Sequence, residues 1–404
     1  MSDSAIPLRR RLGLPLLVLY GTGVTVGAGI YVLVGSVAGH AGMHAPLAFV
    51  VAGVVMGLTV ASYAELCTRF PVAAGEAAYV QGAFGSRLFS TVTGLAMIGI
   101  GVIASAAVTL GAAGYVAQFT DLPRPLVITV IVLAVGLVSA WGILESVLLA
   151  SVFTLIEVSG LVAIIVAAVH ADIPITGTLF TMPTPDVATL SGIGFGSLLA
   201  FFAFIGFEDL TNIVEEAHEP ERNIPLAMAL TLLITTILYV LIATIAVTAV
   251  PLDQLAASTA PLSIVFHELT GVSAATIAAI AIIATLNTII AELTMATRVV
   301  YGMAKLGDLP SSLGAVSGAT ATPLVATAVI VAMVLALALL APLERLAELT
   351  SLITLVVFAI VNLTLLKLRF DGAPAPPRSI RVPIWVPALG LATCASMIAF
   401  AVLK

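Results

Sequence analysis

The pattern of hydrophobic and polar positions along this chain is a series of long apolar segments separated by short polar ones. A run of about 20 apolar residues has the length of a helix that crosses the hydrocarbon core of a bilayer. The strands of a membrane β-barrel would instead alternate apolar and polar residues over about ten positions. The pattern therefore predicts an all-α polytopic membrane protein. Its eleven predicted spans are residues 14–39, 46–69, 87–119, 123–141, 147–170, 191–217, 225–250, 271–306, 323–341, 345–368 and 383–403.

Composition strengthens this class and excludes others. Of the 404 residues, 61% are hydrophobic and 9% are charged, whereas a soluble domain carries about 25% charged residues. Cys67 and Cys394 fall in or beside apolar spans and form neither a disulfide framework nor a metal motif. We find no nucleophile–base set and no nucleic-acid signature. We therefore expect no enzymatic activity, no cofactor and no nucleic-acid partner, and a surface in contact with membrane lipid.

The placement of basic residues predicts the orientation of the chain. Membrane proteins concentrate Lys and Arg on the cytoplasmic side. With residues 1–13 as a cytoplasmic tail, twelve of the fifteen basic residues fall at inner span ends. The other three, at outer ends, are Arg124, Arg345 and Lys404. The C-terminus is then outside, and the polar segment 251–269 is expected to form an outer loop with short helices.

A glycine-rich stretch, residues 21–31, lies inside the first predicted span. It contains Gly21, Gly23, Gly27 and Gly29, and each glycine weakens a helix by about 1 kcal/mol relative to alanine. A broken helix is tolerated at membrane depth only where its free backbone groups are buried in protein or line a cavity. The stretch therefore predicts either a discontinuous helix at a binding site or close packing of a neighbouring helix against the glycines.

A second interruption is predicted in the sixth span, where the apolar residues 198–207 lead directly into Glu208 and Asp209. Spans one and six begin two consecutive sets of five, and an odd number of spans inverts the second set relative to the first. Interrupted helices at matching positions of inverted halves are typical of transporter substrate sites. We therefore predict a five-plus-five inverted repeat with one extra C-terminal helix. The first repeat is 14–170, the second is 191–368 and the additional span is 383–403.

Several segments resemble motifs of the amino acid–polyamine–organocation (APC) superfamily. They are residues 23–31 in the first span, 71–79 with Phe84 and Gly85 in the first inner loop, 201–208 in the sixth span, Glu215, Glu216 and 219–225 after it, and Asn287, Arg298, 301–304, Leu309, Pro310, Thr322 and Pro323 from the eighth span onward. These matches run in the same order as in the superfamily. The chain thus looks like an amino acid permease, which implies ten core spans in an inverted repeat, an amino acid or amine substrate, and alternating access.

The resemblance also implies a substrate site built from main-chain groups of the two breaks. The amides expected to hold the substrate carboxylate are those of Gly27, Ala28 and Gly29. The carbonyls expected to receive its ammonium lie at or near Val24, Thr25, Phe202 and Ile205. Helix physics agrees, because a helix N-terminus attracts an anion and carbonyls released at a break suit an ammonium, which only donates. Phe202 resembles the superfamily's aromatic gate over the substrate, with an ordinary packed phenylalanine as the alternative.

Buried carboxylates in membrane spans are candidates for ion coupling or substrate binding. The candidates here are Glu157 in the fifth span, Glu208 and Asp209 in the sixth, and Glu292 in the eighth. A lysine occupies the position of Glu157 in several superfamily members, so that lysine's role does not carry over. Glu157 could carry the coupled proton or pair permanently with a neighbour, and Glu208 could be a helix-start acid. Glu292 could bind a cationic side chain, couple a proton or pair structurally.

We therefore expect a secondary transporter of amino acids in the cytoplasmic membrane, which binds its substrate between spans one and six and alternates access. Proton coupling through Glu157 or the Glu208/Asp209 pair is the preferred energy source. Sodium is the alternative ion, with Thr285 and Thr288 as candidate ligands, although membrane threonines more often bond their own helix. An exchanger or uniporter without ion coupling and a non-transporting amino acid sensor are the rival hypotheses.

Overall fold

The computed structural model describes residues 12–27, 29–71, 75–141, 147–175, 177, 183–318, 320 and 322–403. Within these ranges the chain forms no strand, apart from an isolated bridge between Leu12 and Ala217. The helices in chain order are α1 (Leu14–Val26), α2 (Gly29–Ala41), η1 (Gly42–His44), α3 (Ala45–Arg69), α4 (Gly75–Phe84), α5 (Arg87–Val116), α6 (Arg124–Trp141), α7 (Val147–His170), α9 (Val187–Phe202), η2 (Phe207–Glu216), α10 (Pro220–Ala249), α11 (Leu252–Ala257), α12 (Pro261–Thr270), α13 (Ala275–Lys305), η3 (Ser311–Gly314), α14 (Leu324–Leu340), α15 (Leu343–Phe370) and α16 (Trp385–Val402).

Nine helical runs in the described part of the chain are long and apolar enough to cross a membrane. One of them, Gly29–Arg69, joins α2, η1 and α3, while α1 and α14 are apolar but shorter. These helices confirm the predicted all-helical, multi-pass class. The number of eleven spans stays a prediction, as does the inverted relation between the two halves.

The first helix break lies within the glycine-rich stretch. α1 begins with Pro15 in its first turn, where the missing N–H costs nothing, and it ends at Val26. Gly27 follows with φ −8° and ψ −96°, which is not helical, and α2 begins at Gly29. The helix axis is therefore interrupted within three residues, although the flanking segments are both apolar.

The second break follows α9. This helix begins after Asp186, whose carboxylate caps it by accepting a hydrogen bond from the Thr189 amide. It ends at Phe202, and a turn leads into the 3₁₀ helix η2. The last residue of that turn, Gly206, has φ 120°. A residue with a Cβ adopts this backbone conformation only with strain. Glycine at this position therefore permits the change from α-helix to 3₁₀ helix.

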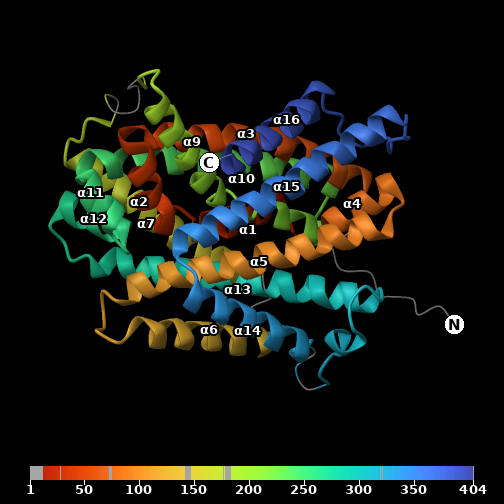
Figure 1. Ribbon diagram of the computed structural model, residues 1–404, viewed down its shortest axis with the longest axis horizontal. Helices are drawn as coiled ribbons and strands as arrows, with labels where there is room; N and C mark the ends of the chain where they lie inside the picture. The colour runs from red at the N-terminus through yellow and green to blue at the C-terminus, as the bar shows by residue number, and fades with distance from the viewer. Residues whose placement is uncertain are drawn as a thin grey trace.

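The long helices pack in pairs around these breaks. α5 runs beside α13, and α6 beside α14 (Figure 1). α3 packs along α10, and α15 packs against α16 and α5. α1 contacts α7, α10 and η2, while α2 contacts α9. The predicted polar loop 251–269 does contain short helices, α11 and α12, near one end of the molecule, and α4, which hydropathy does not predict, lies near the other (Figure 1). The breaks are thereby enclosed by other helices.

Candidate substrate-binding site

The two helix breaks meet in the interior. A Cβ added to Gly29, the first residue of α2, would lie 2.3 Å from the Cα atom of Ala203 in the second break. A Cβ added to Gly206 would lie 3.0 Å from the carbonyl oxygen of Val24 in α1. Backbone approaches this close are open only to glycine. The glycines therefore interrupt the helices and let the two interruptions touch.

A tyrosine on α10 joins the two breaks by hydrogen bonding. The hydroxyl of Tyr239 lies 2.7 Å from the carbonyl oxygen of Thr25 and 2.8 Å from that of Ala203. Both carbonyls lie where a helix ends, so they lack a complete set of intrahelical partners. The Tyr239 side chain is fully buried. The hydroxyl has a single proton, so the two carbonyls, one from each break, share this one donor.

A small internal cavity lies at this meeting point. Its lining includes five of the residues that the sequence proposes for the substrate site: Val24, Thr25, Gly29, Phe202 and Ile205. The remaining lining residues are Ala104 and Val108 of α5, and Thr288 and Glu292 of α13. Its accessible volume is about 10 Å³, which matches about one water molecule. An amino acid therefore needs the lining to move apart before it can enter.

Some of the main-chain groups proposed for the substrate are already hydrogen bonded in this conformation. The Gly27 amide donates to the carbonyl oxygen of Gly23 at 3.1 Å, so it continues the hydrogen bonding of α1. The Thr25 carbonyl accepts from Tyr239, but a carbonyl oxygen has a second lone pair. Gly29 starts α2 at the cavity, where a helix N-terminus favours an anion. Ala28 lies outside the described residues.

Phe202 differs from the other phenylalanines around it. Phe201 packs against Phe358, Phe204 packs against Phe49 and Tyr239, and Phe207 packs against Tyr63 and Phe358. Phe202 instead lines the cavity and is 7% exposed. It is the last residue of α9, where the second break begins. This placement is compatible with the aromatic gate that the sequence suggests.

Glu157 on α7 is buried and bound to α13. Its Oε1 atom accepts a hydrogen bond from the Asn287 side-chain amide at 2.9 Å. Its Oε2 atom is buried with no hydrogen-bond partner within the described ranges. The Glu157 carbonyl oxygen accepts from the Tyr31 hydroxyl at 2.6 Å. The carboxyl therefore has one neutral partner and one free oxygen, which suits a group that gains and loses a proton.

Glu208 and Asp209 lie in η2 and are buried. The Glu208 carboxylate accepts a hydrogen bond from the Gly206 amide at 2.9 Å, which caps the start of η2. Asp209 accepts from the Asn212 side chain at 3.2 Å. Neither residue is among those that line the cavity. The geometry therefore favours the helix-start interpretation for Glu208.

Thr285 and Thr288, the candidate sodium ligands, bond their own helix. Thr285 donates to the Ala281 carbonyl at 2.8 Å, and Thr288 donates to the Ala284 carbonyl at 3.2 Å. This is the usual arrangement of threonine within a helix. It supplies no geometric argument for a sodium site.

Sequence reasoning missed three residues of this region. Tyr239, Ala104 and Val108 lie in long apolar spans, α10 and α5, whose uniform hydrophobicity does not reveal which side faces the centre. Only Tyr239 carries a signal, because a polar hydroxyl within a membrane span needs a hydrogen-bond partner.

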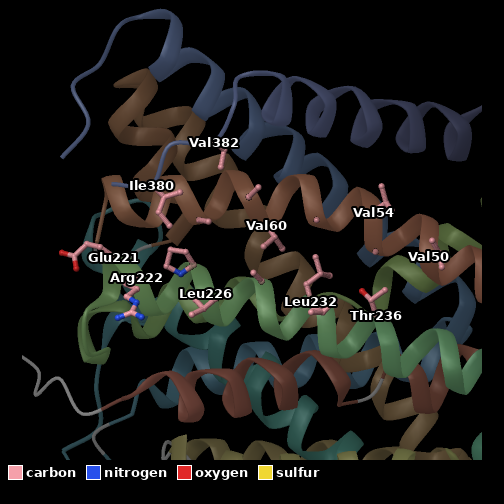
Figure 2. A pocket seen from close by; sticks show the side chains of 17 residues that line it. Val50, Val54, Val60, Glu221, Arg222, Leu226, Leu232, Thr236, Ile380 and Val382 are labelled. Atoms are coloured by element: carbon pink, nitrogen blue, oxygen red, sulfur yellow. The ribbon is translucent and has the colours of Figure 1, made fainter. Parts of the chain in front are cut away.

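A larger hollow lies elsewhere, between α3 and α10. This groove of about 800 Å³ is lined mainly by aliphatic side chains and glycines. Figure 2 shows Val50 and Val54 at one end and Glu221 and Arg222 at the other. A zwitterion requires polar partners for both of its charges. Its charged lining residues, Glu221 and Arg222, lie together at one end and the rest of its wall is apolar, whereas the smaller cavity lies where the two helix breaks meet.

Comparison with known proteins gives the family. Residues 17–403 match the sequence model of the amino acid permease family. The chain belongs to this family. The expected resemblance to the APC superfamily is thereby confirmed over nearly the whole permease.

The relatives of the permease include proteins named as cationic and as branched-chain amino acid transporters. It is 31% identical over 397 residues to "Cationic amino acid transporter 4, vacuolar" of Arabidopsis thaliana, in an alignment covering 92% of this chain and 66% of that one. It is 30% identical over 403 residues to "Cationic amino acid transporter 4" of Homo sapiens, covering 92% and 61%. It is 30% identical over 417 residues to "Branched-chain amino acid permease BcaP" of Bacillus subtilis, covering 97% and 88%. The permease thus spans less than two thirds of the length of the two cationic amino acid transporters.

Proposed function

We propose that the permease is a secondary transporter that carries amino acids across the cytoplasmic membrane by alternating access. The observation that carries this proposal is the cavity between the two helix breaks, which places the first residue of α2 beside carbonyl-bearing residues of α1 and α9. A helix N-terminus and free carbonyl lone pairs can bind the two poles of an amino acid without any charged side chain. The names of the relatives support the same substrate class.

The cycle that we propose begins with separation of the cavity walls. Phe202 and Ile205 of the second break move away from α1, the substrate enters, and Phe202 closes over it. Access to the opposite side follows when the helices that carry the breaks move against the rest of the bundle. Such movement of a bundle around a fixed central site is the general mechanism of transporters with interrupted helices.

We further propose that a proton drives uptake, with Glu157 as the first candidate to carry it. Its Oε2 atom is buried without a partner in the described part of the chain, and its Oε1 atom accepts from the neutral amide of Asn287. Protonation gives the Glu157 carboxyl an O–H donor that the carboxylate lacks. It therefore changes the hydrogen bonds that Glu157 can form with the helices that enclose the breaks. The Glu208/Asp209 pair is the second candidate.

Transport by purified permease in proteoliposomes tests these proposals. We expect labelled amino acid to accumulate inside when the outside is more acidic, and a sodium gradient alone to give no accumulation. Accumulation driven only by sodium would overturn proton coupling. Uptake stimulated by internal amino acid but by neither gradient would show an exchanger. Binding without any counterflow would show a sensor and would overturn transport.

A further inference from the structure

Among the described residues that line the cavity, Glu292 is the one carboxylate. We propose that it binds the positively charged side chain of the substrate, so that the permease selects amino acids with a cationic side chain. The inference rests on the proposed function, since it assigns the substrate class of that same site.

The position of Glu292 provides the first argument. It lies in the middle of α13, a helix that carries neither of the breaks. Its side chain is 4% exposed, and its Oε2 atom is buried with no hydrogen-bond partner among the residues described. A buried carboxylate oxygen without a partner is costly, and the cost falls when an opposite charge with hydrogen-bond donors is supplied. A ligand in the cavity can supply that charge.

The other lining residues provide the second argument. The side chains of Ala104, Val108 and Ile205 are aliphatic, and Phe202 is aromatic. The Thr25 hydroxyl is buried without a hydrogen-bond partner in the described ranges. An ammonium or guanidinium group carries only donors, and its aliphatic stem packs on apolar surface. A cationic side chain therefore matches both the carboxylate and its apolar surroundings.

The charges around Glu292 provide the third argument. Asp209 and Glu208 lie close enough to interact electrostatically with it, and both are acidic. Arg298 offsets part of this negative charge through its interaction with Asp209. Acidic groups gathered in an enclosed region favour a bound cation, because the cation stabilises their charged forms. The same field disfavours a carboxylate at this end of the site, which places the substrate's own carboxylate at the N-terminus of α2.

The proposed roles, with Glu292 binding the cationic side chain and the start of α2 binding the carboxylate, can be tested by comparing affinities for different amino acids. Affinities for lysine, arginine, leucine and alanine are measured by isothermal titration calorimetry on the purified permease and on Glu292→Gln and Glu292→Asp. We expect the wild type to prefer lysine or arginine. Glu292→Gln should lower the affinity for these two by about 10- to 100-fold, as expected for loss of a charged hydrogen-bond partner. It should leave leucine and alanine within about twofold. Glu292→Asp should keep the preference for the cationic amino acids.

Glu76→Gln is the matched control. Glu76 is a buried acid that accepts a hydrogen bond from Tyr63 and is not among the cavity residues. Glutamine keeps that acceptor, so we expect the ratio of lysine to leucine affinity to stay at the wild-type value. A matching loss of that preference in the control would overturn the assignment to Glu292.

Further outcomes separate this inference from the proposed function. An equal loss of affinity for all four amino acids in Glu292→Gln would assign Glu292 to the α-ammonium and overturn the inference. If Glu292→Gln does not fold, competition on the wild type decides, because leucine displacing lysine at equal concentration overturns it as well. Wild-type permease that binds leucine but neither cation would overturn the inference alone. Binding of none of the four would overturn the proposed function too.

Discussion

The hydroxyl of Tyr239 lies 2.7 Å from the carbonyl oxygen of Thr25, so α10 is hydrogen bonded to the end of α1 at the first helix break. The same hydroxyl lies 2.8 Å from the Ala203 carbonyl in the second break. A single side chain from a third helix thus orients main-chain groups of both interrupted helices. We expect the candidate site to depend on this tyrosine, because carbonyls at helix ends have no intrahelical donor to hold them.

Replacing Tyr239 with phenylalanine should weaken both stability and substrate binding. The lost hydrogen bond is worth about 0.5–1.5 kcal/mol, which corresponds to an increase of about 2- to 10-fold in KM for uptake. Tyr115→Phe is the control, since its hydroxyl also donates to a buried carbonyl, that of Tyr31. We expect Tyr115→Phe to lower Tm by a similar amount with less effect on KM. An unchanged KM in Tyr239→Phe would show that this hydroxyl does not organise the site.

Replacing Glu157 with glutamine should separate coupling from transport. Glutamine keeps an oxygen for the Asn287 hydrogen bond of 2.9 Å, so we expect a Tm close to that of the wild type. It cannot take up a proton, so accumulation driven by a pH gradient should be lost while exchange of internal for external substrate continues. Both are measured in proteoliposomes. Retained proton-driven accumulation, together with its loss in Glu208→Gln, would move the coupling site to the Glu208/Asp209 pair.

Replacing Gly29 with alanine should disrupt the meeting of the two breaks. The added Cβ would lie 2.3 Å from the Ala203 Cα atom, and backbone cannot yield as a flexible side chain does. We expect at least the cost of about 1–3 kcal/mol that overpacking usually brings, seen as a lower Tm in detergent and loss of uptake. Gly302→Ala on α13 is the control, because no atom lies within 4 Å of its added Cβ. A wild-type Tm and uptake rate for Gly29→Ala would contradict the close approach.

Replacing Glu65 with alanine should destabilise the permease strongly. This buried carboxylate at the end of α3 binds Arg69 at 2.8 Å and Arg369 at 2.6 Å, and it accepts the Val382 amide at 2.9 Å. Removing it leaves two guanidinium groups without their acid, which typically costs about 3–5 kcal/mol for a buried pair.

The exposed pair on α15 is the control for that experiment. Glu348 lies 2.9 Å from Arg345, whose side chain is 61% exposed, and such surface pairs contribute about 0–1 kcal/mol. Thermal unfolding in detergent should therefore show a large fall in Tm for Glu65→Ala and little change for Glu348→Ala. Equal effects of the two substitutions would show that the bonds from Glu65 to Arg369 and Val382 do not stabilise the connection between α15 and α16.

The class of the protein and the positions of both breaks follow from the sequence by itself. Apolar runs of membrane length predict helices, because backbone N–H and C=O groups in hydrocarbon must form hydrogen bonds within the protein. Gly27, Gly29 and Gly206 lie at the interruptions, where local conformation depends on the residue itself rather than on distant contacts. The motif resemblance identified the family for the same reason, since it rests on residues close together in the chain.

Only the tertiary structure determined which residues of other helices surround the two breaks. The apolar sequence of α5 does not indicate that Ala104 faces the centre, and the Tyr239 hydroxyl indicates only that it needs a partner, because the rotation of one membrane helix against another is set by packing with its neighbours. The same holds for Asn287 meeting Glu157 and for Glu292 entering the lining of the cavity. Local backbone preference determined where the helices are interrupted, and side-chain packing between distant helices determined what surrounds the interruption.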